Sequence, residues 1–218
     1  DLENFKTRVR QDRREYDGDW LIAEEDGQPV GTATSLSLTM WMRGAPIPCQ
    51  GVAWVGAVRT HRRRGNGDQP GVASAVMQEI LHKARQRHQF ISALMPFRVS
   101  FYEHFGYGVV ERMCEWEVPL AIMPACDTTG IRFFGPGDLP QMQALHQRIV
   151  QRGQCDVERS PHAWENQQRN WPNGFVVVDQ PDGQPLQGWM SFQQVSRNGR
   201  QCAQVTEIDY DTPDVLRR

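Results

Sequence analysis

The passage from a buried strand to a helix between residues 51 and 84 most constrains the fold. "GVAWVGAV", residues 51–58, is apolar at successive positions, which is typical of a central strand buried on both faces. Beyond a glycine-containing loop, apolar residues recur at the spacing of one helical face: Val72, Ala73, Val76, Met77, Ile80, Leu81 and Ala84. We therefore predict an α/β domain in which the loop follows the carboxyl end of a central strand.

The loop concentrates positive charge in a chain whose formal net charge is -2. Its basic residues are Arg59, His61, Arg62, Arg63 and Arg64, and Gly65 and Gly67 follow them. The overall charge argues against a surface that binds nucleic acid or anionic membrane throughout. Backbone N–H groups at the start of a helix bind anions, and arginine forks match phosphate. The pattern predicts a phosphate-bearing ligand, with a solvated basic loop or a weak nucleic-acid patch as the alternatives.

The surrounding elements complete the first α/β unit. Asp26-Gly27-Gln28-Pro29 is turn chemistry, and it predicts a hairpin of strands Trp20–Glu24 and Val30–Met42. "RGAPIPCQG", residues 43–51, is expected to be a loop because it holds two prolines. Further on we expect a buried strand over 90–97, a short helix starting near residue 99 and a strand over 109–120.

The chain then begins a second time. Residues 121–129 carry turn formers without periodicity, so we expect a domain over 1–120, a linker over 121–129 and a second, degenerate and incomplete domain over 130–218. A helix is expected to start near Asp138, a good N-cap residue. Asp-Gly-Gln-Pro recurs at 182–185 between two apolar segments, as it does at 26–29, which favours a structural repeat.

Cysteine usage and hydropathy exclude several classes of protein. Five widely spaced cysteines predict neither a zinc site nor a disulfide framework, so we expect no metal. No apolar run approaches the roughly 18 residues of a membrane span, so a cytoplasmic protein that does not bind membrane is the default. Because the chain begins with Asp1, we expect a processed chain or a fragment.

Two motifs resemble a known superfamily. Arg62-x-x-Gly65-x-Gly67 after a buried strand resembles the pyrophosphate-binding signature of the GCN5-related N-acetyltransferases (GNAT). "VRTHRRRG" together with "SFYEHFGYG" resembles the Eis-type (enhanced intracellular survival) branch, which acetylates amines such as those of aminoglycosides. The resemblance covers residues 18–120, and the second half resembles that branch's degenerate second unit. One departure is the intervening "NGDQP", which leaves Gly65, Gly67 and Gly71 as alternatives for facing the pyrophosphate.

The resemblance implies a GNAT-like mixed sheet flanked by helices, acetyl-CoA as the acetyl donor, a small-molecule amine as acceptor and a homo-oligomer. It also implies roles for individual residues. Tyr102 would be the general acid, with Tyr107 as the alternative, and Trp54 falls where the branch places an aromatic side chain in its acceptor pocket. Trp41 is a weaker candidate for lining an acceptor groove. Backbone groups of Val55, Ala57 and Val58 would contact the pantetheine and thioester, and the pyrophosphate would lie against Arg62, Arg63, Gly65 and Gly67.

Other residues are expected to take no part in binding or catalysis. Glu103 and His104 flank Tyr102 in sequence, but we expect both at the surface, and the general base is not identified. The second half ends in acids that would repel a pyrophosphate, so we expect no coenzyme A binding there: Asp209, Asp211 and Asp214. The alternatives to an enzyme are a non-catalytic acyl-CoA-binding or scaffold protein and a nucleic-acid module.

Overall fold

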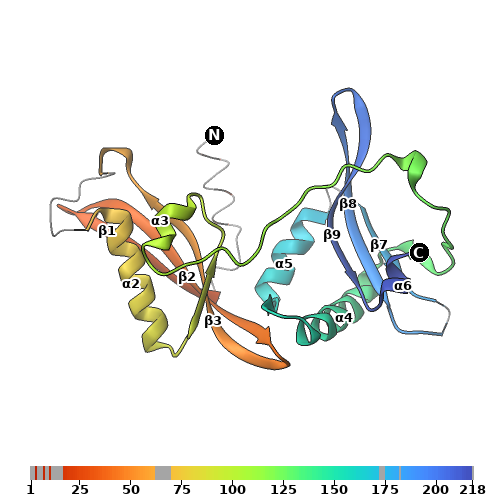
Figure 1. Ribbon diagram of the computed structural model, residues 1–218, viewed down its shortest axis with the longest axis horizontal. Coiled ribbons are helices and arrows are strands. Elements are labelled where there is room, and N and C mark those ends of the chain that lie inside the picture. Colours follow the sequence, from red (N-terminus) through yellow and green to blue (C-terminus); the bar gives the residue numbers. More distant parts are fainter. Residues whose placement is uncertain are drawn as a thin grey trace. The chain divides into compact units, whose positions relative to one another are not determined.

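The computed structural model describes residues 17–61, 70–171, 175–181 and 183–217, together with three helical positions near the N-terminus, Glu3, Thr7 and Arg10 (Figure 1). The chain divides into two compact units. The first unit comprises Asp1–Met40, Pro46–Cys114 and Arg159–Ala163, and the second comprises Trp41–Ala45, Glu115–Glu158 and Trp164–Arg218. Each unit has its own sheet and its own apolar core.

The sheet of the first unit places its strands in the order β1 (Gly18–Glu25), β2 (Gln28–Met42), β3 (Ala45–Ala57) and β4 (Ile91–Leu94). β1 and β2 are antiparallel, whereas β3 and β4 are parallel, so the sheet is mixed as predicted. Asp26 and Gly27 join β1 to β2 with φ values of 51° and 73°, the left-handed pair that a two-residue hairpin turn needs. The predicted hairpin is therefore confirmed.

The prediction of a loop over residues 43–51 is wrong. Arg43 and Gly44, with φ values of 51° and 76°, turn the chain directly from β2 into β3. Pro46 and Pro48 lie two residues apart, so the N–H groups that they lack belong to the same edge of β3. Because β4 pairs with β3 only from Cys49 onward, prolines are compatible with this part of the strand.

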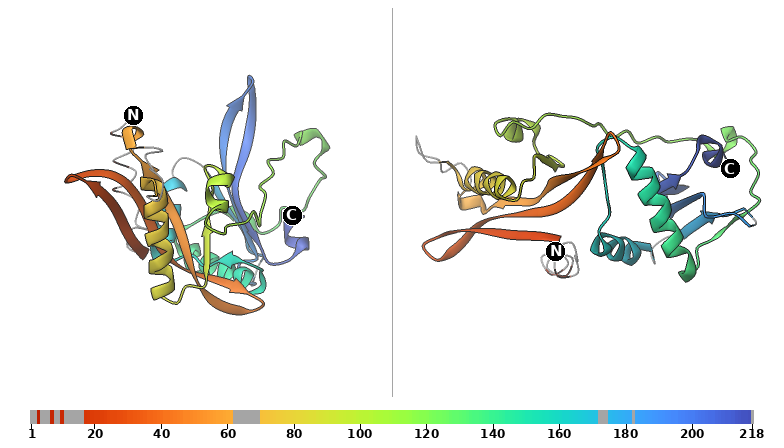
Figure 2. Two further views of the ribbon diagram at one scale, coloured as in Figure 1. Left: turned by 60° about the vertical axis from the view of Figure 1, so that its left-hand side comes forward. Right: turned by 90° about the horizontal axis from the view of Figure 1, so that it is seen from below.

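Helix α2 (Val72–Gln86) lies along one face of this sheet (Figures 1 and 2). The predicted apolar stripe faces the sheet, and Val76, Met77, Ile80 and Ala84 are buried. They pack with sheet residues that include Leu21, Ala33 and Val52. A 3-10 turn, η2 (Arg59–His61), follows β3, and the short helix α3 (Val99–Glu103) follows β4.

The second unit contains a four-stranded sheet in the order β5 (Ile131–Phe133), β7 (Phe175–Asp179), β8 (Gly188–Arg197) and β9 (Arg200–Tyr210). All neighbouring strands are antiparallel. Side chains of α4 (Leu139–Arg152) and α5 (Pro161–Asn170) pack with β7 and β8 in the core. The remaining elements are η3 (Leu120–Ile122), η4 (Pro136–Asp138), β6 (Asp156–Val157) and α6 (Pro213–Leu216).

The strand predicted over residues 109–120 does not form. Residues 109–119 have no assigned helix or strand, and Val110 is 96% exposed. The alternating pattern fits an extended backbone, but a strand also needs a neighbouring strand to receive its hydrogen bonds. The sequence pattern cannot supply that partner.

Asp138 stabilises the start of α4, where the sequence predicted a cap. Its carboxylate accepts two hydrogen bonds of 2.6 Å from the Arg132 guanidinium and one of 2.7 Å from the backbone N–H of Gly135. The hydrogen bonds from Arg132 lower the pKa of Asp138 most, and burial opposes them. The side chain thus fixes the turn before the helix instead of bonding to the first helical N–H groups.

We expect Asp138→Asn to lower the free energy of unfolding of the second unit by about 1–3 kcal/mol, because two charge-assisted bonds are lost. The lowered pKa means that this stabilisation is present above the unfolded value, near 3.9, and disappears as the pH falls through the folded value. Urea unfolding at several pH values measures it. Asp214→Asn is the matched control, because its bond to Arg217 is exposed and should contribute almost nothing. A difference between wild type and Asp138→Asn that grew toward acid pH would contradict this account.

Candidate active site

The backbone of β3 changes direction at Trp54. Val52 and Val55 both pack against the core of the first unit, although an uninterrupted strand would send residues three apart to opposite faces. Trp54 lies between them with a φ of 54°, a left-handed value in the middle of a strand. An extra residue in this conformation is the geometry of a β-bulge, and it restores the strand to the core after a shift of one position.

The same bulge places the Trp54 side chain on the sheet face opposite to α2. Leu21 points into the core, so its neighbour Trp20 points to the other face. The rings of Trp20 and Trp54 stack with centroids 6.2 Å apart and an interplanar angle of 26°. Trp20 remains 37% exposed. The pair forms an aromatic platform at the surface of the sheet, and nothing in the sequence had singled out Trp20.

β3 and β4 separate just before this bulge. Their parallel pairing runs from Cys49–Ile91 to Val52–Leu94, where β4 ends, whereas β3 continues to Ala57. The predicted cofactor positions lie on this continuation: Val55 is half-buried against the core, Ala57 ends the strand and Val58 is exposed. The backbone N–H of Val58 bonds to the carbonyl of Val30 at 2.9 Å, so β2 holds the far end of the continuation. Among the described residues, β4 therefore pairs with β3 no further than Val52.

The predicted pyrophosphate loop falls outside the described residues. This applies to Arg62, Arg63, Gly65 and Gly67, all within residues 62–69. The alternative glycine, Gly71, is described: it is the N-cap of α2, and its carbonyl accepts bonds from Ser74 and Ala75. Its φ of -65° is an ordinary value, so glycine is not needed there for backbone conformation.

Tyr102 lies in α3 and is buried against the residues at which the strands separate. It is 4% exposed, and its core cluster includes Val52, Val55 and Leu94. Burial raises the pKa of the phenol, and the neighbouring Tyr107 raises it further. The Tyr102 hydroxyl has no hydrogen-bond partner within the described residues, so its proton is available to a ligand.

Gly106 brings Tyr107 back beside Tyr102. With a φ of 87°, Gly106 lets the chain reverse after α3, and the backbone N–H groups of Phe105 and Tyr107 both bond to the carbonyl of Tyr102. The two tyrosine rings meet edge to face with centroids 6.0 Å apart. The Tyr107 hydroxyl lies 2.5 Å from the Ser92 hydroxyl. The "FGYG" sequence therefore acts as a helix stop that pairs the two tyrosines.

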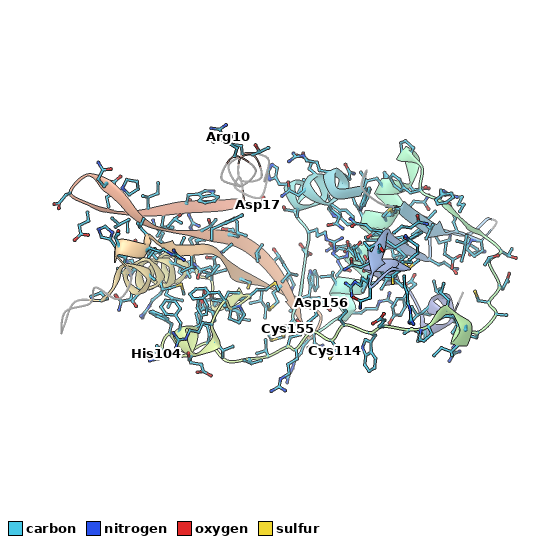
Figure 3. All side chains as sticks on the ribbon, turned by 90° about the horizontal axis from the view of Figure 1, so that it is seen from above. Arg10, Asp17, His104, Cys114, Cys155 and Asp156 are labelled. Atoms are coloured by element: carbon cyan, nitrogen blue, oxygen red, sulfur yellow. The ribbon has the colours of Figure 1, made fainter. Side chains whose placement is uncertain are left out.

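The other predicted residues do not belong to the core cluster of Tyr102. Trp41 belongs to the second unit, where its indole N–H donates to Glu158. Glu103 and His104 are exposed as predicted, and Figure 3 shows His104 on the outer side of α3. The acids of the second unit are bound to other side chains: Asp209 to His146 and Trp189, Asp211 to Arg148 and Arg152, and Asp214 to Arg217.

Two findings of absence apply to the part of the chain that the structure describes. It contains no group of three or more His, Cys, Asp or Glu side chains arranged to hold a metal ion. None of its helices is long and apolar enough to cross a membrane.

The first unit thus contains a bulged strand that parts from its parallel neighbour beside a buried tyrosine. Residues 3–110 match the family model described as "Acetyltransferase (GNAT) domain". This part of the chain is therefore a GNAT acetyltransferase domain, which confirms the superfamily implied by the sequence motifs.

Known proteins resemble the chain beyond this domain. An uncharacterised N-acetyltransferase of Streptomyces avermitilis is 23% identical over 195 residues, which are 79% of this chain and 44% of that protein. The crystal structure of a GCN5-related N-acetyltransferase from Anabaena variabilis matches 91% of this chain and 50% of its own with a TM-score of 0.80 and 19% identity. The crystal structure of Eis1 from Mycobacterium abscessus matches 100% of this chain and 58% of its own, with a TM-score of 0.68 and 19% identity. The chain thus spans about half the length of these relatives, and the two structural likenesses show a shared fold.

Because the backbone of Trp54 is left-handed, we expect the usual order of stability of alanine and glycine variants to be reversed at this position. We expect Trp54→Gly to be more stable than Trp54→Ala by about 1 kcal/mol, because only glycine adopts this φ without strain. Trp20 is the matched control: it lies in β1 outside the left-handed region, so there alanine should be the better residue by about 0.5–1 kcal/mol. Urea unfolding of the four variants measures both differences. The same order at both positions would show that β3 has no bulge at Trp54.

Proposed function

We propose that the protein is an acetyl-CoA-dependent N-acetyltransferase of the Eis-type branch that acetylates a primary amine on an aminoglycoside-like or lysine-like small molecule. The observation that carries the proposal is the burial of Tyr102 where β3 and β4 part. A thioester bound beside β3 would place its sulfur next to the protonated phenol of Tyr102. The resemblance of "VRTHRRRG" and "SFYEHFGYG" to motifs of the Eis-type branch also supports the proposal.

Acetyl-CoA would bind along β3 and at the start of α2. Backbone groups of Val55, Ala57 and Val58 would contact the pantetheine and the thioester, taking the place of the strand partner that β4 no longer provides. The pyrophosphate would lie against the loop between β3 and α2, held by the guanidinium groups and backbone N–H groups of Arg62, Arg63, Gly65 and Gly67.

The transfer requires one proton to reach the departing sulfur. The neutral amine attacks the thioester carbonyl, the carbon–sulfur bond breaks, and Tyr102 protonates the thiolate. The acetylated nitrogen releases its proton to water, and the Tyr102 phenolate regains a proton from water. A phenol is protonated at neutral pH even without burial, and burial raises the pKa of Tyr102 further. The same apolar surroundings disfavour a free thiolate, which favours transfer of the proton to sulfur.

The acceptor would approach from the sheet face opposite to α2, where the bulge places the half-buried Trp54. The Trp20–Trp54 platform offers flat apolar surface that suits a sugar ring or an alkyl chain, and aromatic faces attract ammonium groups before they deprotonate. We also propose Trp41 for the acceptor groove, as the weaker candidate because its indole N–H is already bonded to Glu158. As in the Eis-type branch, we propose a cytoplasmic homo-oligomer, which light scattering would detect.

The central test is thiol release from acetyl-CoA in the presence of an aminoglycoside or a lysine-like amine. We expect Tyr102→Phe to lower kcat by about 10²–10⁴-fold, because general acid catalysis is lost, while calorimetry shows acetyl-CoA binding within twofold of wild type. Tyr210→Phe, which removes a hydroxyl from β9, is the control and should leave kcat unchanged. Acetyl-CoA binding without thiol release from any acceptor would instead establish a non-catalytic acyl-CoA-binding protein.

The cofactor loop is tested separately by charge removal. Arg62→Ala and Arg63→Ala should each weaken acetyl-CoA binding by about tenfold or more, because each removes a charge-assisted bond to phosphate. Arg85→Ala, in the last turn of α2, removes the same charge away from the loop and should change binding less than twofold. Equal losses in all three variants, or displacement of acetyl-CoA by duplex DNA, would contradict a specific pyrophosphate site.

A further inference from the structure

A chain of hydrogen bonds crosses the core of the first unit beside the point where β3 and β4 part. Gln50 is fully buried, and its Nε2 atom lies 2.7 Å from Ser35 Oγ and 2.8 Å from the carbonyl oxygen of Ile80. Ser92, the residue paired with Gln50 in β4, lies 3.0 Å from Gln50 Oε1. Its Oγ is also 2.5 Å from the hydroxyl of Tyr107. The chain thus joins β2, β3, β4 and α2 to the segment that follows α3.

Counting protons fixes the direction of every bond in this chain. The carbonyl of Ile80 can only accept, so the atom that faces it must be the amide nitrogen of Gln50 and the amide oxygen must face Ser92. That oxygen can only accept, so Ser92 donates its one hydroxyl proton to Gln50. Ser92 then has no proton left for Tyr107. The Tyr107 hydroxyl is therefore the donor, and its proton points into the core.

We propose that Gln50 and Ser92 act as positioning residues, which hold Tyr107 by its hydroxyl and through the Tyr107 ring orient the catalytic phenol of Tyr102. The inference deepens the proposed function and rests on it. Tyr107 is not a second proton donor, because its hydroxyl proton is already donated to Ser92. Tyr102 is left as the hydroxyl that a departing sulfur can use.

The position of these hydrogen bonds in the sheet explains why they affect Tyr102. Gln50 and Ser92 form the pair two residues before Val52 and Leu94, at which the strands part. Their side chains link the two strands across the sheet immediately before the backbone ladder ends. Ser92 holds the hydroxyl of Tyr107, and the Tyr107 ring contacts the Tyr102 ring edge to face. Without these hydrogen bonds, the two parting strands and the Tyr102 phenol would no longer be tied to the same buried side chains.

Nuclear magnetic resonance of tyrosine-labelled protein tests the bond direction and the positioning without any substrate. We expect one hydroxyl proton that exchanges slowly with water and gives a nuclear Overhauser effect to the Tyr107 ring. That signal should vanish in Ser92→Ala and persist in Ser92→Thr, which keeps a hydroxyl. Ring flipping of Tyr102 should accelerate at least tenfold in Ser92→Ala and Tyr107→Phe. An absent hydroxyl signal in the wild type, or an unchanged Tyr102 flip rate, would overturn the proposal.

Kinetics distinguish positioning from simple support of the fold. At a temperature well below every Tm, Ser92→Ala and Tyr107→Phe should lower kcat by about 10- to 100-fold, because a misplaced catalytic group costs that much. The KM for acetyl-CoA should stay within twofold, and Ser92→Thr should recover most of kcat. Ser100→Ala is the matched control, because Ser100 is exposed on α3 and its hydroxyl accepts a hydrogen bond from Arg98. It should leave kcat and KM unchanged.

Two kinetic results would refute the positioning role. Unchanged kcat in folded Ser92→Ala would show that the chain supports only stability. A loss in Tyr107→Phe equal to that in Tyr102→Phe, with Ser92→Ala unaffected, would make Tyr107 the proton donor. If Ser92→Ala does not fold, Tyr107→Phe keeps the ring and serves in its place. A wild-type protein that released no thiol would refute the proposed function, and the ring-flip comparison would then decide the positioning of Tyr102 independently.

Discussion

The left-handed backbone at Trp54 is the constraint on which the first unit depends. A tryptophan in this conformation costs roughly 1–2 kcal/mol, so packing on both sides of the residue must hold it in place. Val52 and Val55 do so by inserting into the same core. The result is a strand that faces α2 before and after the bulge and presents one aromatic side chain to the opposite face in between. A strand without the bulge would bury Trp54 and expose Val55.

The bulge and the separation of β3 from β4 are coupled. A bulged strand bends and twists more strongly, which opposes continued pairing with a flat neighbour. Pairing ends at Val52, two residues before Trp54, and the chain after β4 turns away into α3. Tyr102 occupies the space beside this divergence and contributes its ring to the core that holds the bulge. Candidate catalytic residue and strained strand therefore stabilise each other.

Sequence patterns located the parts of the site that depend on local periodicity or on a motif. The apolar run 51–58, the stripe of α2 and the Asp26–Gly27 turn are encoded within a few residues, and the structure confirms them. Contacts between strands that are far apart in the sequence could not be predicted in this way. Trp20 looked like one apolar residue of an edge strand, Gln50 lay in a segment assigned to a loop, and Ser92 was an unremarkable polar residue in a short strand. Their roles arise only when β1, β3 and β4 come together.

The third strand of the second unit is also irregular, but it contains no left-handed residue. β7, β8 and β9 repeat the antiparallel order of β1, β2 and β3, yet none of residues 200–210 of β9 has a left-handed φ. The acids that follow are neutralised in pairs, with Asp211 held by Arg148 and Arg152. The register of β9 against β8 shifts between Ser191 and Phe192, so Thr206 is an extra residue between the paired Val205 and Glu207. The coenzyme site that we propose therefore rests less on the sheet topology, which both units share, than on one left-handed residue that only the first unit contains among its described strands.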